Sequence, residues 1–180
     1  MNVHRNNVLD LLKRYNPSDE VEIENKKKVT KFIEAHPDCF ERSLVFGHLT
    51  GSCWLANFDM SQFLLTKHKK MKMWLQLGGH ADGDNDIKRT AIREAREESG
   101  LQNIELISYE IFDLGVHIMP SYDSVLEHLH FDFRFLMRAS DETERIQISS
   151  ESDDLRWFSM PPIDNPDINR MFKKWKDYTS

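Results

Sequence analysis

The chain has 180 residues, of which 39% are hydrophobic and 30% are charged, a composition that fits one globular domain with a short extension rather than a disordered chain. The formal net charge of −6 argues against non-specific binding to nucleic acid, which needs a basic surface. Two cysteines, Cys39 and Cys53, are too few for a disulfide framework. Neither a signal-peptide pattern nor a membrane-spanning apolar run occurs in the sequence, so we expect a cytoplasmic protein that does not bind membranes.

The first forty residues are predicted to be helical. Apolar residues recur at i, i+3, i+4 and i+7 from Val8 to Tyr15, which is the spacing of one helix face. Pro17 ends this helix, and Ser18 is the predicted cap of a second helix. We therefore predict an N-terminal helical extension over residues 1–41 and a main domain over residues 42–180.

The main domain is predicted to mix strands and helices. Strands are expected over residues 52–58, 62–66, 73–77, 104–114, 126–137 and 155–159, and helices over 87–99 and from Asn165-Pro166 onward. In the segment 126–137, apolar and polar residues alternate, as they do in a strand. His128, His130, Asp132 and Arg134 therefore share one face of that strand.

Three carboxylates are the main chemical signal. Glu94, Glu97 and Glu98 stand at i, i+3 and i+4 of the helix predicted over 87–99, so they share one face. Like charges at this spacing repel each other, and a hard divalent cation with oxygen ligands would remove that cost. The alternative reading of this spacing alone is a solvated helix face with an Arg93–Glu97 ion pair.

The wider segment from Gly79 to Leu101 favours the metal reading. It resembles the Nudix box, G-x5-E-x7-R-E-U-x-E-E-x-G-U, where U is a bulky aliphatic residue. At roughly 6% usage per residue type, six fixed matches coincide by chance at about 10⁻⁷ per starting point. The matching residues are Gly79, Arg93, Glu94, Glu97, Glu98, Gly100 and Leu101. The closest resemblance is to bacterial Nudix proteins with a WLQxGGHADGD sequence at the box.

The resemblance implies a fold, an activity and a set of site residues. The fold would be an α/β/α sandwich around a mixed sheet, and the activity would be hydrolysis of a diphosphate linkage in a nucleoside diphosphate linked to another group. Mg²⁺, with Mn²⁺ as a substitute, would be bound by the Gly78 carbonyl together with Glu94, Glu97 and Glu98. Arg93 would orient Glu94. The general base would be Glu94 or the later loop residue Glu151.

The sequence departs from the family pattern in three places. Asn85 stands where the family has its first Glu, Leu77 stands where a Pro usually precedes the glycine pair, and Ala95 occupies the aliphatic position inside the helix. The nearby Asp82-x-Asp84-x-Asp86 resembles the start of an EF-hand loop. Ile87 and Arg93 occupy the positions where that loop needs Gly and Glu, so we expect the aspartates to cap the helix instead.

Residues outside the box are candidates for substrate binding. Trp74, His128 and His130 are the main ones, with core packing as the alternative for Trp74. His117 and Tyr122 are further candidates for stacking on a base. The histidines and Asp132 could instead form a second metal site, or simply the polar face of a half-buried strand.

Two other functions remain open from the sequence. A Nudix fold could bind a nucleotide without turnover, with Asn85 as the sign of lost catalysis. An isoprenoid diphosphate isomerase would use a catalytic cysteine, for which Cys53 is the candidate, although a buried strand thiol is the simpler reading. The expected partner is a small nucleotide-like diphosphate, and the sequence leaves a homodimer open.

Overall fold

The computed structural model of the chain describes residues 3–121 and 125–180. Twelve elements follow one another in these two stretches. Helices are α1 Val3–Arg14, α2 Glu20–Ala35, α3 Ile87–Ser99 and α4 Pro166–Thr179. Strands are β1 Gly47–Ala56, β2 Phe63–His68, β3 Trp74–Leu75, β4 Leu77–His80, β5 Ile104–Leu106, β6 Asp113–Met119, β7 His128–Ala139 and β8 Ser152–Phe158.

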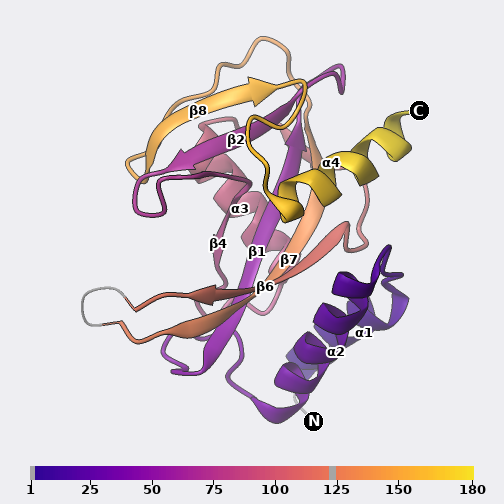
Figure 1. Ribbon diagram of the computed structural model, residues 1–180, viewed down its shortest axis with the longest axis vertical. Coiled ribbons are helices and arrows are strands. Elements are labelled where there is room, and N and C mark those ends of the chain that lie inside the picture. Colours follow the sequence, from indigo (N-terminus) through magenta and orange to yellow (C-terminus); the bar gives the residue numbers. More distant parts are fainter. Residues whose placement is uncertain (1–2, 122–124) are drawn as a thin grey trace.

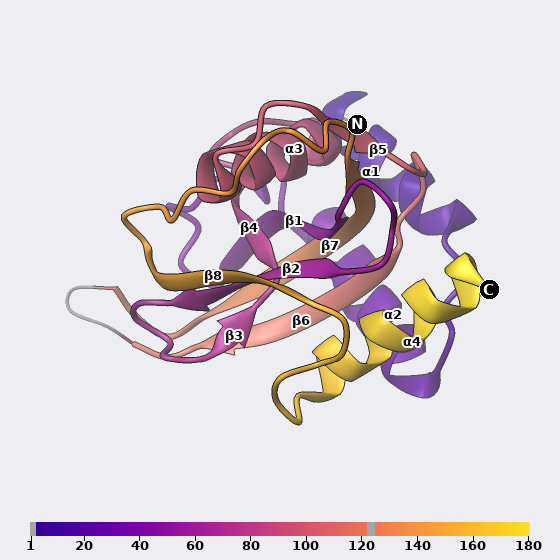
Figure 2. The same ribbon diagram turned by 90° about the horizontal axis from the view of Figure 1, so that it is seen from above.

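All the strands belong to one mixed, curled sheet (Figure 1). At its centre β1 runs parallel to β7, while the other pairings of these two strands are antiparallel. All ten residues of β1 are buried, as expected for a strand covered on both faces. Helices on the sheet agree with the predicted α/β/α sandwich around a mixed sheet, and Figure 2 shows α3 and α4 on opposite sides of the sheet.

Two apolar clusters fill the space on the two sides of the sheet. The first joins α1, α2 and α3 to the sheet, and the stacked rings of Phe32 and Phe131 lie within it. The second joins α4 to the sheet, with the buried rings of Trp54 and Trp175 in contact. As predicted, Ile168, Met171 and Trp175 are the buried stripe of α4, whereas Phe172 is only partly buried.

Some predicted boundaries were wrong. Asp19, not Ser18, is the N-cap of α2, because its carboxylate accepts the Glu22 backbone N–H at 2.8 Å, and Ser18 instead donates to the Glu22 side chain. The single strand predicted over 104–114 is two strands, β5 and β6, which pair with different parts of β7. The strand predicted to begin at Ser52 begins at Gly47.

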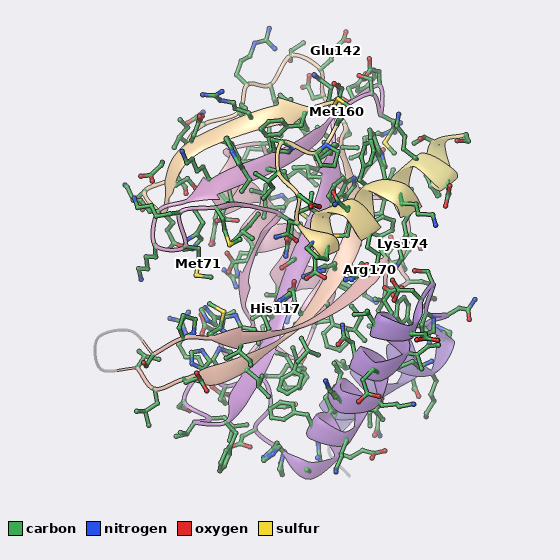
Figure 3. All side chains as sticks on the ribbon, viewed as in Figure 1. Met71, His117, Glu142, Met160, Arg170 and Lys174 are labelled. Atoms are coloured by element: carbon green, nitrogen blue, oxygen red, sulfur yellow. The ribbon has the colours of Figure 1, made fainter. Side chains whose placement is uncertain are left out.

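A buried ion network crosses the molecule between α2, the sheet and α4. Its members are Glu22, Asp113, Asp132, Arg134, Asp167, Arg170 and Lys174. Arg134 is 1% exposed and lies 2.7 Å from Asp113 and 2.8 Å from Asp132. Figure 3 labels Arg170 and Lys174 on α4, and both bind Asp113 from that side. On the strand face predicted to be polar, Asp132 and Arg134 are therefore buried and paired, while His128 and His130 are only partly buried.

The N-terminal helices contribute to this network and to the first apolar cluster. Lys174 of α4 forms an ion pair with Glu22 of α2, and Asn25 of α2 donates to the Leu114 carbonyl of β6 at 2.9 Å. The division of the chain at residue 42 stays a prediction. Among the described residues, no helix is both long enough and apolar enough to cross a membrane.

Candidate active site

The helix that carries the three carboxylates has the predicted bounds because both of its ends are capped. Asp86 accepts the backbone N–H groups of Lys88 and Arg89, and Gly100 adopts the left-handed conformation at φ 76° that ends many helices. The other two aspartates of the preceding loop bind arginines, Asp82 with Arg42 and Asp84 with Arg89. Of the three aspartates expected to cap the helix, only Asp86 does so, and Asp82 and Asp84 form ion pairs with arginines instead.

The carboxylates differ in their exposure. The Glu94 side chain is 15% exposed and that of Glu97 is 59% exposed, while Glu98 is buried at 6%. Arg93 contacts two of them, with Nη1 2.7 Å from Glu94 and 3.0 Å from Glu97. Its Nη2 donates to the His80 carbonyl at 2.9 Å, which fixes the guanidinium between α3 and β4.

The glycine pair of β4 lets this strand approach the carboxylates. The Gly78 N–H donates to Oε2 of Glu98 at 2.8 Å. A Cβ atom at Gly79 would lie 2.5 Å from the Glu94 carboxyl carbon, and one at Gly78 would lie 2.1 Å from the Ser52 hydroxyl oxygen. No side chain fits at either position without displacing these groups, so the box glycines are explained by close approach.

The electrostatics of the carboxylates favour a bound cation. Burial raises the pKa of Glu98 to about 8, with the Gly78 N–H opposing and the charges of Glu94, Glu151 and Glu97 adding to the rise. Burial also raises the pKa of Glu94, although Arg93 opposes it. One guanidinium does not compensate this group of carboxylates, and an oxygen-only donor set of this kind fits a hard divalent cation.

Glu151 lies within electrostatic reach of this group. It immediately precedes β8, its side chain is exposed, and its backbone carbonyl accepts the Lys69 N–H at 2.9 Å. Its charge contributes to raising the pKa of both Glu94 and Glu98. Glu151, fifty positions after the end of the box at Leu101, therefore influences the carboxylates of α3 electrostatically.

The strand face that carries His128 and His130 divides into two parts. The two histidines lie beside His48 of β1 and His80 of β4. Asp132 is directed elsewhere: it accepts hydrogen bonds from Thr50 and Ser52, and also from Gln76 and Arg134. The idea of a metal site made of the histidines together with Asp132 was wrong, because the buried arginine and hydroxyl groups occupy that carboxylate.

Three histidines of this group, His48, His80 and His130, have lowered pKa values. Burial and then the neighbouring His80 and His128 lower the pKa of His48 to about 4. Burial and then Arg42 lower the pKa of His80 to about 4. Burial and the surrounding histidines hold the pKa of His130 far below its ordinary value.

The remaining candidates lie apart from the carboxylates. Trp74 is partly buried in the second apolar cluster, where its ring meets Phe158 edge-on at 4.9 Å. Nε2 of His117 lies 2.6 Å from Nη2 of Arg134 and 3.4 Å from Asp167, at the edge of the ion network. Tyr122 lies outside the described residues.

Sequence reasoning missed two residues of the histidine group, His48 and His80. They lie 32 positions apart in the chain and come together only because β1 pairs with both β7 and β4. In the register of the parallel pair His48 lies opposite His130. No local pattern could have indicated this meeting, since it depends on which strands are neighbours.

The chain is similar to known proteins in sequence and in fold. Residues 48–175 match the NUDIX domain family, and no curated protein matches the sequence. Three similar structures are an Ap4A hydrolase from C. elegans, a NUDIX-family hydrolase from Clostridium perfringens and a MutT protein from Methanosarcina mazei Go1. Their TM-scores are 0.58, 0.53 and 0.54, at 15%, 21% and 14% identity. They cover 73%, 73% and 76% of this chain and 96%, 97% and 98% of their own.

Because the family match spans well over half of the sequence, the chain belongs to the Nudix family. Its enzyme class is that of the Nudix pyrophosphohydrolases, whose members generally use a divalent metal. The isomerase alternative loses its proposed nucleophile, since Cys53 is fully buried and burial raises the pKa of its thiol well above the usual value. Such a thiol is an inert part of the core.

Proposed function

We propose that this protein is a magnesium-dependent hydrolase that cleaves the diphosphate linkage of a nucleoside diphosphate joined to another group. The observation that carries the proposal is the carboxylate group of α3, where Glu94 and Glu98 are largely buried beside the glycine pair with Arg93 as their cation. Mn²⁺ has the same preference for oxygen donors and should substitute for Mg²⁺.

The proposed metal donors are the Gly78 carbonyl and the carboxylates of Glu94, Glu97 and Glu98. A bound Mg²⁺ supplies a water of lowered pKa and neutralises charge on the diphosphate. The chain then contributes position and proton transfer. Arg93 holds Glu94 and Glu97 through Nη1 and is itself fixed by the His80 carbonyl, so the carboxylates enter the reaction in one arrangement.

The general base is proposed to be Glu94 or Glu151. Glu94 has a raised pKa, which brings it closer to the pH at which it must accept a proton from water. Glu151 is exposed and unencumbered by Arg93, so it could meet a water on the open side of the site. Whichever carboxylate acts, the proton leaves the attacking water as phosphorus is attacked in line with the leaving phosphate oxygen.

Substrate recognition is assigned to a small nucleotide-like molecule. The net charge of −6 disfavours long nucleic acids, and the similarity to an Ap4A hydrolase suggests a nucleotide diphosphate or polyphosphate. Trp74, His128 and His130 stay proposed substrate contacts. A cytoplasmic location is also proposed, supported by the two free cysteines, and a homodimer stays open.

The competing function is a nucleotide sensor that binds without turnover, as the change of the family Glu to Asn85 would suggest. The retention of Glu94, Glu97 and Glu98 argues against it, because a protein that no longer catalyses has no need for a buried glutamate whose ionisation costs stability.

A panel of substrates tests the proposal. ADP-ribose, nucleotide sugars, dinucleoside polyphosphates and nucleoside triphosphates are incubated with the protein and Mg²⁺, and the phosphate-containing products are separated and identified. We expect at least one compound to be split at a diphosphate linkage. Binding of a panel compound by calorimetry, without any product from the whole panel, would establish the sensor instead.

A further inference from the structure

Four histidines from three strands meet beside the carboxylate site, and we call them the histidine cluster: His48, His80, His128 and His130. His48 lies at the centre, with its ring centroid 4.8 Å from that of His130, 4.9 Å from that of His80 and 5.0 Å from that of His128. These four residues are half of the eight histidines in the chain. Sheet pairing creates the cluster, because His48 lies opposite His130 in the parallel register of β1 and β7.

His48 is buried without a polar partner. His48 is 3% exposed, and neither its Nδ1 nor its Nε2 has a hydrogen-bond partner among residues 3–121 and 125–180. Leaving a buried polar group unsatisfied costs about 1–3 kcal/mol. A side chain held at this cost, with its nitrogens among other imidazoles, points to a ligand that the cluster binds.

The nitrogens of three rings converge. One ligand nitrogen from each of His48, His128 and His130 lies within 4.8 Å of the other two. Nε2 of His128 and Nε2 of His130 are 3.2 Å apart. Two nitrogens bound to one tetrahedral zinc ion at 2.0–2.1 Å would be about 3.3 Å apart. This pair already has the separation of two zinc ligands, and a ring nitrogen of His48 lies within 4.8 Å of both.

The tautomer of His128 is also suitable. Nδ1 of His128 lies 2.8 Å from the Leu126 carbonyl oxygen, which can only accept, so Nδ1 carries the proton and donates it. The lone pair of Nε2 therefore faces the other rings. Metal-binding histidines are commonly held in this way, with the second ring nitrogen donating to a carbonyl.

We infer that His48, His128 and His130 form a binding site for a divalent transition-metal ion of the zinc type, separate from the carboxylate site on α3. The donors are all imidazole nitrogens, which suit zinc, copper or nickel, whereas Mg²⁺ prefers oxygen. His80 borders the site, but its Nδ1 lies 3.1 Å from Nη2 of Arg42, so we do not count it among the ligands. Asp132 is excluded because its two oxygens are already bound within the buried ion network.

A metal in this position would join the beginning of β1 to the beginning of β7. It would also give the unsatisfied His48 ring a partner. An ion that binds only the folded chain adds RT ln(1 + [L]/Kd) to stability, so zinc should raise the melting temperature.

Zinc titration against a chromophoric chelator tests the inference. The full chain is used in excess Mg²⁺, which occupies the carboxylate site. We expect one zinc ion per chain, and we expect His128→Ala to weaken its binding by about a hundredfold or more. His36→Ala is the matched control, since the ring of His36, at the C-cap of α2, contacts Phe32 and Phe46 and none of the cluster histidines, and it should leave zinc affinity unchanged. Glu98→Gln should keep zinc binding even if it abolishes turnover.

A second measurement uses only the wild-type protein, so it does not depend on whether a variant folds. Histidine ring ¹⁵N NMR of the wild-type chain, with Mg²⁺ present, should show zinc-dependent shifts confined to the cluster and absent at His36 and His68. Wild-type protein that binds no zinc in Mg²⁺, or zinc binding that His128→Ala leaves unchanged, would overturn the inference. If His128→Ala changes the Michaelis constant of a panel substrate without changing zinc affinity, the histidines line the substrate site instead.

Discussion

Glu98→Gln should reduce turnover of any substrate found in the panel by about a hundredfold or more, while the metal-free protein becomes more stable. The substitution keeps the shape of the side chain and an oxygen that can accept the Gly78 N–H. It removes one proposed metal donor and one buried carboxyl group whose ionisation burial makes unfavourable. Activity and stability therefore move in opposite directions, which loss of a merely structural residue would not produce.

The stability change should depend on pH. Because the pKa of Glu98 is raised to about 8 in the folded protein, its burial is unfavourable at pH values above its ordinary pKa of about 4.5, and the cost grows until pH 8. The gain in unfolding free energy of Glu98→Gln should thus be small at pH 5 and on the order of 1 kcal/mol or more at pH 8. Chemical denaturation without metal, at both pH values, measures it.

A suitable control is Glu105→Gln, because Glu105 is a half-exposed glutamate of β5 that pairs with Arg138. It should change neither turnover nor metal dependence. Mg²⁺ should stabilise the wild type and the control more than it stabilises Glu98→Gln. A Glu98→Gln protein that is less stable without metal and retains near-normal specific activity would show that Glu98 is structural.

Arg134→Met should cause the largest loss of stability, about 3–5 kcal/mol, because it leaves buried carboxylates without their shared cation. Arg134 donates to Asp132 and Asp113 at 2.8 and 2.7 Å and to Asp167 at 3.1 Å. The free energy of unfolding of a domain is about 5–15 kcal/mol in total, so the variant would lose a large part of its stability. The free energy of unfolding in urea gives the value.

Arg138→Met is the matched control on the same strand. Arg138 is 36% exposed and pairs with Glu105 on the neighbouring strand, so its loss should cost no more than about 1 kcal/mol. Equal losses in the two variants would mean that the buried network contributes no more than a surface ion pair.

The difference in unfolding free energy between the wild type and Arg134→Met should become smaller in acid. Burial would raise the pKa of Asp113, but the hydrogen bond from Arg170 and the charges of Arg134 and Lys174 outweigh burial and hold it well below its usual range. A lowered pKa stabilises the fold above the unfolded-chain value of about 3.9, and this contribution is lost as the pH falls below it. In the folded wild type Asp113 is still ionised at pH 2, so the difference in unfolding free energy between wild type and variant should decrease below about pH 4 without vanishing at pH 2.

The sequence was sufficient where local chemistry decides structure. The helix 87–99 has its predicted bounds because Asp86 and Gly100 cap it and no breaker lies between them. The face pattern of β7 was also predictable, because alternation is a property of a single strand. The carboxylate group follows from the helix, since helical spacing alone brings Glu94, Glu97 and Glu98 to one face.

Features that depend on neighbouring strands were not predictable. The strand expected over 104–114 is interrupted because its two ends pair with different parts of β7, which the local sequence does not encode. The alternation of β7 placed Asp132 on one face with His128 and His130, as a possible metal site. In the structure, Thr50, Ser52 and Arg134 donate hydrogen bonds to its carboxylate instead. The histidine cluster needed β1 and β4 to supply His48 and His80.

Metal removal and restoration test the central claim most directly. The best substrate of the panel is assayed with Mg²⁺, then with an excess of chelator, and then with Mg²⁺ added beyond the chelator. We expect turnover to vanish with chelator and to return with Mg²⁺ alone, without zinc, because the carboxylates of α3 need a hard cation to act. Undiminished turnover in excess chelator would contradict a hydrolase that works through these carboxylates.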